Sequence, residues 1–573
     1  MQVDILLALF LLLLSLYLEA LKILIMKVYH FFIAFLLMNF NSFAQMNEAP
    51  AKITWGSELE EPNNSFISKV IPAGDNFYAI RRKTKSGLVT GSKKVYIEKY
   101  NSEMKLEKSQ DIALKYKNKE LDFEDVIILN NNLFLLSSFH NKGKGKNYLF
   151  SQMINMRNLS ASKNLSKIGE IETRGINREG SFGVHISRDS SKVLIYNDLP
   201  YKKGKPERFS LKVFNDSFEE LWNRDIILPY DDEHFSVEEY QVDKDGNVYL
   251  LGVIYQDPTR TRRQGKPTYQ YTILTYTSNG EEVQEYKIDF KDNFITDLTF
   301  RVGDDGDLVC SGFYSAVGDY SIKGTYFFRL NPQTNEIYNR NLKDFDFDFL
   351  TEFMSDRKKK NAEKAEREGN TKKQVELFSY SLDNLVLRSD GGALLIAEQY
   401  YVQSQRDNDY YGSGLYSGYF NPRRGYYNNS VNQVEDHYNY NDIIVVNIKP
   451  TGEIEWAARI PKRQETIDDG GYYSSYAMSI VKDRIFFVFN DNIKNFQEKK
   501  RPEKVYNFNG SNSIIALAEV TRDGAVNTYP LFSNREAGTL TLPKICKQSG
   551  KNKMTIYGER GRRYRFANIE FTN

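Results

Sequence analysis

The chain has 573 residues, a formal net charge of +2 at pH 7, two cysteines and five histidines. Its hydrophobic fraction of 41% suffices for a packed core, which argues against global disorder. The aromatic fraction of 14% favours pleated sheet over helix. The net charge by itself favours no class of partner, nucleic acid is not expected, and the lack of clustered His and Cys argues against a zinc site.

Two apolar stretches open the chain. The second, 26–44, has the apolar run Phe31–Met38 and small residues up to Ala44, which is typical of a secretory signal peptide. The first, 1–25, has two interpretations: a start codon assigned too early, or a membrane anchor of about 20 residues. We therefore expect export to the periplasm, the outer surface or the extracellular space. Membrane contact is expected only if residues 5–25 are retained.

Two alternating strands joined by a polar turn recur about every 58 residues through 45–573. The copies begin near Ser65, Phe123, Val184, Tyr240, Ile295, Leu382, Ser474 and Leu540. A third strand follows in the first seven copies, and then a fourth that often carries an aromatic residue at one place: Trp222, Tyr286, Tyr338, Trp456 and Tyr529. Four antiparallel strands per repeat predict an all-β fold, a single β-propeller of about eight four-stranded blades. Seven blades remain the alternative if the second repeat is misread.

The last repeat contains only three strands between Leu540 and Phe571. The segment Lys52–Trp55 carries its Trp where the other fourth strands carry an aromatic residue. It therefore fits the missing position. Pairing of the N- and C-terminal segments in one blade would close the ring and remove its free edges.

Two insertions, 346–378 and 402–441, flank the sixth repeat. The first has Glu and Lys at helical spacing ending at Gly369, which predicts a short exposed helix between blades five and six. It lacks an apolar stripe, so it is either a partner contact or a solvated spur. The second is rich in Tyr, including Tyr410 and Tyr411, which suits stacking against a saccharide or peptide. A loop that folds back on the blade rim is the alternative.

Long segments are expected to gather on one face of the ring. Turns between the first and second strands and between the third and fourth share one face, here called the short-turn face, and all of them look short. Loops between the second and third strands and connections between blades share the other, the long-loop face, where binding residues are expected. Its outer loops are basic, as at Arg81, Arg260, Arg262, Arg263 and Lys266, and the connections near the channel are acidic. This pattern predicts an anionic partner at the rim and allows a divalent cation at the channel mouth, with simple solvation as the alternative.

Polar triplets end two strands on the long-loop face, and each could bind a ligand or metal or cap the strand. They are Glu398, Gln399 and Tyr400 in the sixth repeat and Asn490, Asp491 and Asn492 in the seventh. The segments Asp243–Asn247 and Asp304–Asp307 resemble the start of a calcium loop but lack its later Glu, which favours hairpin turns. No cofactor is predicted.

The junction Phe43-Ala44-Gln45 and blade phrases such as Asp243–Tyr249 and Gly452–Trp456 carry one resemblance. In these features the chain is similar to exported bacterial β-propeller-like proteins of unassigned function. The resemblance implies a fold and an exported location, and it transfers no catalytic residue.

Nucleophile-elbow, P-loop, zinc-protease and dinucleotide-binding motifs do not occur, so catalysis stays an open question. The first hypothesis is an exported binding or scaffolding module that uses the long-loop face, with a protein, a glycan or an anionic envelope component as partner. The alternative is a hydrolase or lyase with carboxylates such as Asp231, Asp346 and Asp468 at the channel mouth.

Overall fold

The computed structural model describes residues 49–84, 92–116, 118–173, 180–198, 204–259, 262–263, 266–289, 293–316, 321–369, 375–406, 434–497 and 503–572. The chain divides into two compact units, Met1–Ala49 and Pro50–Asn573, and the text below concerns the second. The upstream apolar segment and the expected signal peptide lie outside the described residues, as do Arg260, Tyr410 and Tyr411.

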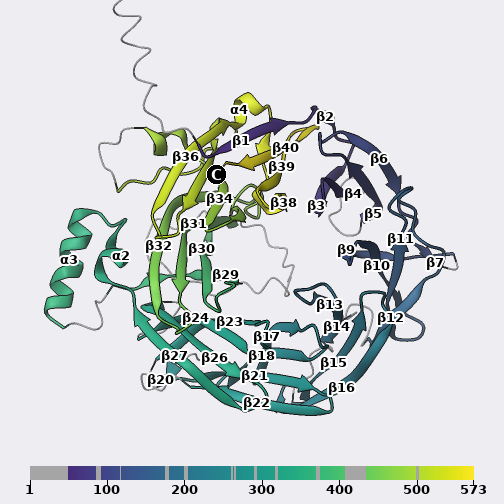
Figure 1. Cartoon of the computed structure of the whole chain (residues 1–573), viewed down its shortest axis with the longest axis horizontal. Coiled ribbons are helices and arrows are strands. Elements are labelled where there is room, and N and C mark those ends of the chain that lie inside the picture. The colour runs from purple at the N-terminus through teal and green to yellow at the C-terminus, as the bar shows by residue number, and fades with distance from the viewer. Residues whose placement is uncertain are drawn as a thin grey trace, which may run out of the picture. The chain divides into compact units, whose positions relative to one another are not determined.

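Eight antiparallel sheets stand in a ring, so the second unit is an eight-bladed β-propeller (Figure 1). Blade 1 consists of β3 (Ser65–Ala73), β4 (Asn76–Thr84), β5 (Ser92–Tyr100) and β6 (Leu106–Asp111), and blade 2 of β9 (Asp122–Leu129), β10 (Asn132–Asn141), β11 (Lys146–Ile154) and β12 (Ser166–Glu172). Blade 3 consists of β13 (Ser181–Ile186), β14 (Lys192–Asp198), β15 (Pro206–Asn215) and β16 (Glu220–Asp231), and blade 4 of β17 (Phe235–Val242), β18 (Val248–Tyr255), β21 (Tyr269–Thr277) and β22 (Glu282–Ile288). Blade 5 consists of β23 (Phe294–Val302), β24 (Leu308–Ser315), β26 (Gly324–Asn331) and β27 (Glu336–Asp344), and blade 6 of β29 (Tyr380–Leu387), β30 (Ala393–Arg406), β31 (Val434–Ile448) and β32 (Ile454–Ile467). Blade 7 consists of β33 (Ala477–Val481), β34 (Arg484–Asp491), β35 (Ile514–Val520) and β36 (Val526–Ser533). The second repeat is therefore a real blade, and the seven-blade alternative is wrong.

Blade 8 joins the two ends of the described chain. Its strands are β37 (Leu540–Thr541) and β38 (Lys547–Gly550), then β39 (Lys553–Arg560), β40 (Arg563–Phe571) and finally β1 (Ala51–Trp55). β1 pairs antiparallel with β40, with Ala51 opposite Phe571 and Trp55 opposite Ala567. The predicted closure by N- and C-terminal segments is confirmed.

Short elements decorate the ring. Strand pairs are β7 (Lys115–Tyr116) with β8 (Lys119–Glu120), β19 (Arg262–Arg263) with β20 (Lys266–Pro267), and β25 (Ser321–Ile322) with β28 (Leu377–Phe378), while β2 (Leu59–Glu60) adds to β40. Among the described residues, the helices are α2 (Phe347–Thr351), α3 (Asp356–Arg367) and α4 (Asn534–Ala537), with the 3-10 turns η3 (Ile493–Phe496), η4 (Gly510–Asn512) and η5 (Pro543–Ile545). The predicted helix between blades five and six is thus α3.

Helix α3 ends where the sequence predicts. Gly369 follows it at a positive φ of 62°, and the N–H of Glu368 donates to the carbonyl of Lys364 at 3.0 Å. Although the sequence shows no apolar stripe, Ala362 and Ala365 are buried. These two small side chains, three residues apart, give the helix one packed face.

Apolar side chains fill the spaces between neighbouring blades. Between blades 4 and 5, for example, Leu251 and Ile273 meet Phe300 and Phe328, all essentially inaccessible to solvent. Aromatic residues of fourth strands add hydrogen bonds to the next blade: Trp222 Nε1 to the Gly246 carbonyl at 2.9 Å, Tyr286 to that of Pro332 at 2.9 Å, and Trp456 Nε1 to that of Arg522 at 2.8 Å. The aromatic position seen in the repeats therefore bonds to the next blade in these three cases, whereas Tyr338 and Tyr529 bond to Asp307 and Glu519 of their own blades.

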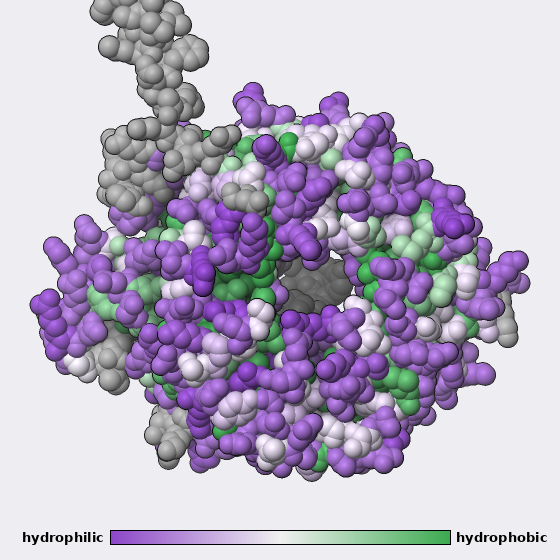
Figure 2. Space-filling model, viewed as in Figure 1, coloured by the Kyte–Doolittle hydropathy of each residue, from purple (hydrophilic) through white to green (hydrophobic). Residues whose placement is uncertain are grey.

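The two faces of the ring have the predicted loop lengths, with one exception. In blade 2 the third and fourth strands are joined by residues 155–165, which is not a short turn. The first strands lie toward the centre and the fourth strands at the rim (Figure 1), and the surface is hollowed at the centre (Figure 2). In blade 6, β30 continues to Arg406 and β31 starts at Val434, so both strands extend into the range 402–441.

Candidate functional site

The predicted site residues fall in two separate places. Arg262, Arg263 and Lys266 lie in the β19–β20 hairpin of blade 4, where the guanidinium of Arg262 is 5.8 Å from the ring centre of Phe294. The two polar triplets lie at the ends of β30 and β34, in neighbouring blades. The structure brings these triplets into one network and leaves the blade 4 hairpin apart from it.

A buried ion pair lies at the centre of this network. Lys462 Nζ is 2.6 Å from Glu398 Oε1, and the two side chains are 0% and 4% exposed. Lys462 also donates to the Tyr440 carbonyl at 2.8 Å and to Gln464 Oε1 at 3.1 Å. Because both charges are removed from water and held by several partners, this pair fixes β30 and β32 relative to each other.

The network continues into blades 7 and 8 through two buried amides. Gln464 Nε2 donates to the Asn490 carbonyl at 2.8 Å. The side-chain amide of Asn490 donates to the carbonyls of Tyr473 and Thr541 at 2.8 Å each. Asn490 is thus a structural tie between three blades and has no surface left for a ligand.

The remaining triplet residues also serve the fold, with one exception. Gln399 Nε2 donates to the Phe378 carbonyl at 2.9 Å. Asp491 accepts from the backbone N–H of Asn492, and Asn492 caps η3. Tyr400 differs, because its half-buried ring packs against Tyr440 with a centre-to-centre distance of 4.6 Å.

Lys544 lies over the Tyr440 ring of this pair, and its side chain remains accessible to solvent. Its Nζ lies 4.3 Å from the ring centre of Tyr440 and donates to the Tyr440 hydroxyl at 3.0 Å and to the Gly471 carbonyl at 2.8 Å. Loss of water around the ammonium group lowers the pKa of Lys544, although Glu398 opposes the shift. Tyr400, Tyr440 and Lys544 form the surface that we call the tyrosine–lysine patch.

The connection between blades 6 and 7 borders the patch. Ser475 has a positive φ of 73° and donates to Glu398 Oε2 at 2.7 Å, while Tyr476 donates to Asp383 Oδ2 at 2.7 Å. A positive φ is costly for a residue with a side chain and is tolerated only where surrounding contacts enforce it. The buried carboxylate of Glu398 provides one such contact.

The first strands of five blades share a bulge at the same place, and the bulged residue is acidic or carries a hydroxyl group. One residue is left unpaired at the same place in the first strand of five blades: Ser68, Glu124, Glu238, Thr296 and Asp383. A bulge re-aims a side chain, and first strands face the centre of the ring. Although the Asp383 side chain keeps exposed surface, the protein that encloses it removes part of its water, and this desolvation, reinforced by the charge of Glu398, raises its pKa to about 7. Burial and the charge of Glu238 likewise raise the pKa of Asp297 to about 7.

Five residues of this region were missed by the sequence analysis: Asp383, Lys462, Gln464, Ser475 and Lys544. The acidic or polar residue inside an otherwise apolar first strand, repeated from blade to blade, was the available indication for Asp383. Nothing in the local sequence indicates the other four, because each has at least one partner that is distant in sequence, such as Glu398 for Lys462 and Tyr440 for Lys544.

Ion pairs neutralise much of the basic rim that the sequence predicts. Arg81 lies inside β4, is 1% exposed and binds two carboxylates, so its assignment to an exposed basic loop is wrong. Other rim cations also have acidic partners: Lys94 with Asp111, Lys146 with Glu170, Arg562 with Glu60 and Arg563 with Glu58. The described part of the rim is therefore less cationic than its lysine and arginine content suggests.

The three aspartates named for a hydrolase or lyase do not form a pair. Asp346 accepts from the backbone N–H of Phe349 at 2.8 Å and so caps α2. Asp468 accepts from the backbone N–H of Asp436 at 2.9 Å, and the carbonyl of Asp231 accepts from the N–H of His234. Each belongs to a different connection between blades, and two of the three side chains hold local backbone.

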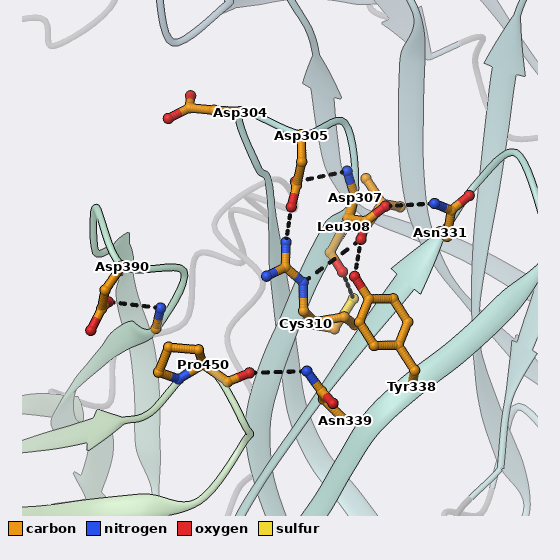
Figure 3. Close-up of polar contacts among 12 residues, drawn as sticks. Asp304, Asp305, Asp307, Leu308, Cys310, Asn331, Tyr338, Asn339, Asp390 and Pro450 are labelled. Carbon is orange, nitrogen blue, oxygen red and sulfur yellow. Dashed lines mark hydrogen bonds and ion pairs between the residues drawn. The ribbon is translucent and has the colours of Figure 1, made fainter.

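The calcium-like segments are hairpin turns with bonded carboxylates, and Figure 3 shows the one at Asp304–Asp307. Asp305 accepts from Arg329 at 2.5 Å, and Asp307 accepts from the Tyr338 hydroxyl. In the corresponding turn of blade 4, Asp243 accepts from the N–H groups of residues 245 and 247. Within the described residues, no group of three or more His, Cys, Asp or Glu is placed to hold a metal ion. In the same part of the chain, no helix has the length and apolar character to span a membrane.

No family model and no curated protein sequence matches the chain. Among solved structures, a protein of unknown function from Bacteroides caccae shares 12% identity and a TM-score of 0.25 over 64% of this chain and 90% of its own. The β-propeller domain of the Trilobed protease from Pyrococcus furiosus shares 10% identity and a TM-score of 0.33, over 82% and 97%. Prolyl oligopeptidase B from Galerina marginata shares 8% identity and a TM-score of 0.35, over 89% of this chain and 56% of its own.

Proposed function

We propose that this protein is an exported binding module that holds a glycan chain on the tyrosine–lysine patch. A propeller fold fits a binding or scaffolding role. The observation that carries the proposal is the partly exposed pair of Tyr400 and Tyr440, with the solvent-accessible side chain of Lys544 placed over Tyr440. Tyrosine rings offer flat apolar faces to sugar rings, and the hydroxyl and ammonium groups offer hydrogen bonds to sugar hydroxyls.

Rigid support favours recognition at this place. Glu398, Lys462, Gln464 and Asn490 are buried and mutually bonded directly beneath the patch. A preorganised surface loses less conformational entropy when it binds a ligand. The triplets predicted to bind a ligand thus support the site, while Tyr400 faces the ligand.

Charge around the patch favours a neutral glycan over an anionic polymer. Asp469 accepts from Thr466 Oγ1 and from the Gly471 N–H, and its charge also acts on Lys544, so an anionic polymer would meet a carboxylate beside the lysine. Together with the ion-paired rim, this weakens the expectation of an anionic partner. A neutral chain meets no such repulsion.

Binding should be measured calorimetrically against soluble dextran, mannan, a β-glucan and polygalacturonate. Tyr400→Ala should weaken the Kd of the bound polymer about tenfold, since loss of one stacked ring costs about 1 kcal/mol or slightly more. Tyr116→Ala, at an exposed tyrosine on β7, is the matched control and should bind as wild type. Failure of the three neutral polymers to bind, binding of polygalacturonate alone, or wild-type affinity of Tyr400→Ala would contradict the proposal.

A hydrolase or lyase activity at the same place is the second candidate. Its support is the pKa of Asp383, which is raised to about 7 beside the buried Glu398. Carboxyl groups of different protonation state can act as acid and base on one bond. Release of new chain ends from a polymer that binds, abolished by Asp383→Asn with binding retained, would establish this activity. A bound polymer that stays intact would exclude it for that polymer.

A further inference from the structure

The connection between blades 8 and 1, here called the seam, continues directly from β1, the strand that closes the ring in blade 8. The segment 56–64 leads from β1, the last strand of blade 8, to β3, the first strand of blade 1. It is held at its start by the Gly56 N–H, which donates to the Phe566 carbonyl at 2.9 Å. Any change that loosens this segment acts on the closure of the whole ring.

One buried arginine binds two carboxylates inside the seam. Arg81 Nη1 is 2.5 Å from Glu61 of the connecting segment, and Arg81 Nε is 2.7 Å from Glu98 of β5. Its guanidinium also lies 4.6 Å from the ring centre of Tyr564 in blade 8. Arg81 and both carboxylates are almost fully buried, so water screens their charges weakly.

A third carboxylate and several tyrosines complete the surroundings of Glu61. Glu559 of β39 interacts with Glu61 and accepts from the Tyr557 hydroxyl at 2.8 Å. From the connection between blades 6 and 7, Tyr472 and Tyr473 face Glu559. On the other side, Tyr100 donates to Glu98 at 2.7 Å and its hydroxyl lies 3.1 Å from that of Tyr564. Two carboxylates therefore bind the guanidinium and a third, Glu559, acts on Glu61, which leaves an excess of negative charge around Glu61 when all three are ionised.

We propose that this seam is a pH-sensitive latch in which protonation of Glu61 tightens the closure of the ring. Protonated Glu61 removes the excess negative charge and leaves the Arg81–Glu98 pair intact. Ionised Glu61 restores the repulsion from Glu98 and Glu559 and loosens the segment 56–64. Glu61 suits the role of switch because it alone of the three carboxylates lies on the connecting segment.

The direction of the pH dependence follows from the environment of Glu61. Burial raises its pKa to about 7; Arg81 opposes this shift, while Glu559 and Glu98 add to it. A carboxyl group that binds its proton more tightly in the closed state stabilises that state at low pH, and the contribution is lost as the pH rises toward 7. Between pH 6 and pH 8 the opening equilibrium of the seam should rise about tenfold.

Hydrogen exchange resolved by mass spectrometry measures this opening. In the wild type, the exchange of residues 51–64, corrected for the intrinsic pH effect, should be about tenfold faster at pH 8 than at pH 6. Glu61→Gln should exchange slowly at both pH values. A pH-independent wild type, or a Glu61→Gln protein that keeps the wild-type pH dependence, would overturn the latch.

Two further variants separate the latch from a general loss of structure. Glu60→Gln alters the neighbouring residue, whose side chain is 72% exposed and pairs with Arg562, and should leave the pH dependence unchanged. Glu559→Gln removes a charge that raises the pKa of Glu61, so its transition should move to lower pH. An unshifted midpoint in Glu559→Gln would contradict the excess-charge explanation. Neither result depends on whether the tyrosine–lysine patch binds a glycan.

Discussion

The turn glycines show how a single residue connects two blades. Gly524 ends a hairpin turn of blade 7 with a φ of 87°, and a Cβ placed there would lie 2.7 Å from the ring of Trp456 in blade 6. Gly306 has the same φ of 87° in a turn of blade 5, with nothing within 4 Å of its Cβ position. Backbone strain is thus shared by both positions, and contact with a neighbouring blade is present at only one.

Replacement of these glycines by alanine should separate the two effects. Gly306→Ala should lower the free energy of unfolding by about 1 kcal/mol, because alanine is strained at positive φ. Gly524→Ala should lower the free energy of unfolding by about 2–3 kcal/mol, because overpacking against the Trp456 ring adds to the backbone strain. Urea denaturation of both variants measures the difference. Equal losses in the two proteins would show that the Trp456 ring moves aside freely.

At the residue scale, the sequence indicates turn chemistry and aromatic positions but not their partners. The Asp-Gly dipeptides and the fourth-strand aromatic residues are local features, so they could be recognised directly. The bond from Trp456 to Arg522 joins residues 66 positions apart, and only the ring arrangement brings them together. For the same reason, burial of Arg81 could not be foreseen from its basic sequence neighbours.

Blade 6 shows how one sheet comes to support the candidate site. Its strands β30, β31 and β32 are the longest of the propeller in the described residues and extend past the ends of other blades' strands. The Glu398–Lys462 pair joins β30 to β32 across this blade, and Ser475 of the next connection binds the same carboxylate. The sequence analysis assigned part of this extension to the insertion 402–441, because a Tyr- and Asn-rich segment interrupts the strand pattern.

Removal of one partner from this pair should be strongly destabilising. Lys462→Met leaves the Glu398 carboxylate buried without its cation, which should cost about 3–5 kcal/mol. Arg463→Met is the control, since that side chain is 53% exposed and its pair with Glu465 is worth less than about 1 kcal/mol. Thermal unfolding of the two variants should therefore differ widely. Similar unfolding temperatures would mean that water reaches Glu398 and compensates for the missing lysine.

The number of blades and their closure are properties of the whole molecule, and the sequence predicts both well. Each blade repeats the same alternation of strands, so periodicity alone defines the ring. The closing strand could be identified because Trp55 matches the aromatic position of other fourth strands. The charge of the assembled surface could not be predicted, because residues such as Arg562 and Glu60 become ion pairs only when the ring closes.

A circular permutation tests the closure. A chain that starts at residue 58 and lacks 50–57 should unfold at a lower temperature, because the edge of β40 loses β1. The same chain with 50–57 attached after Thr572 through a short Gly-Ser linker should regain wild-type stability, since the Thr572 N–H already donates to the Pro50 carbonyl at 2.9 Å. Calorimetry of both proteins provides the measurement. Failure of the reattached segment to restore stability would show that β1 stabilises blade 8 only when the chain continues from it directly into residue 58.

The place where the described chain ends has a practical consequence. Phe571 donates its N–H to the carbonyl of Asn552, which lies in a turn of the short-turn face, so β40 ends on that face. An affinity tag or surface tether added at the C-terminus would emerge on the side of the disc away from Lys544. Protein captured by that end on a sensor chip would present its tyrosines to the flowing solution.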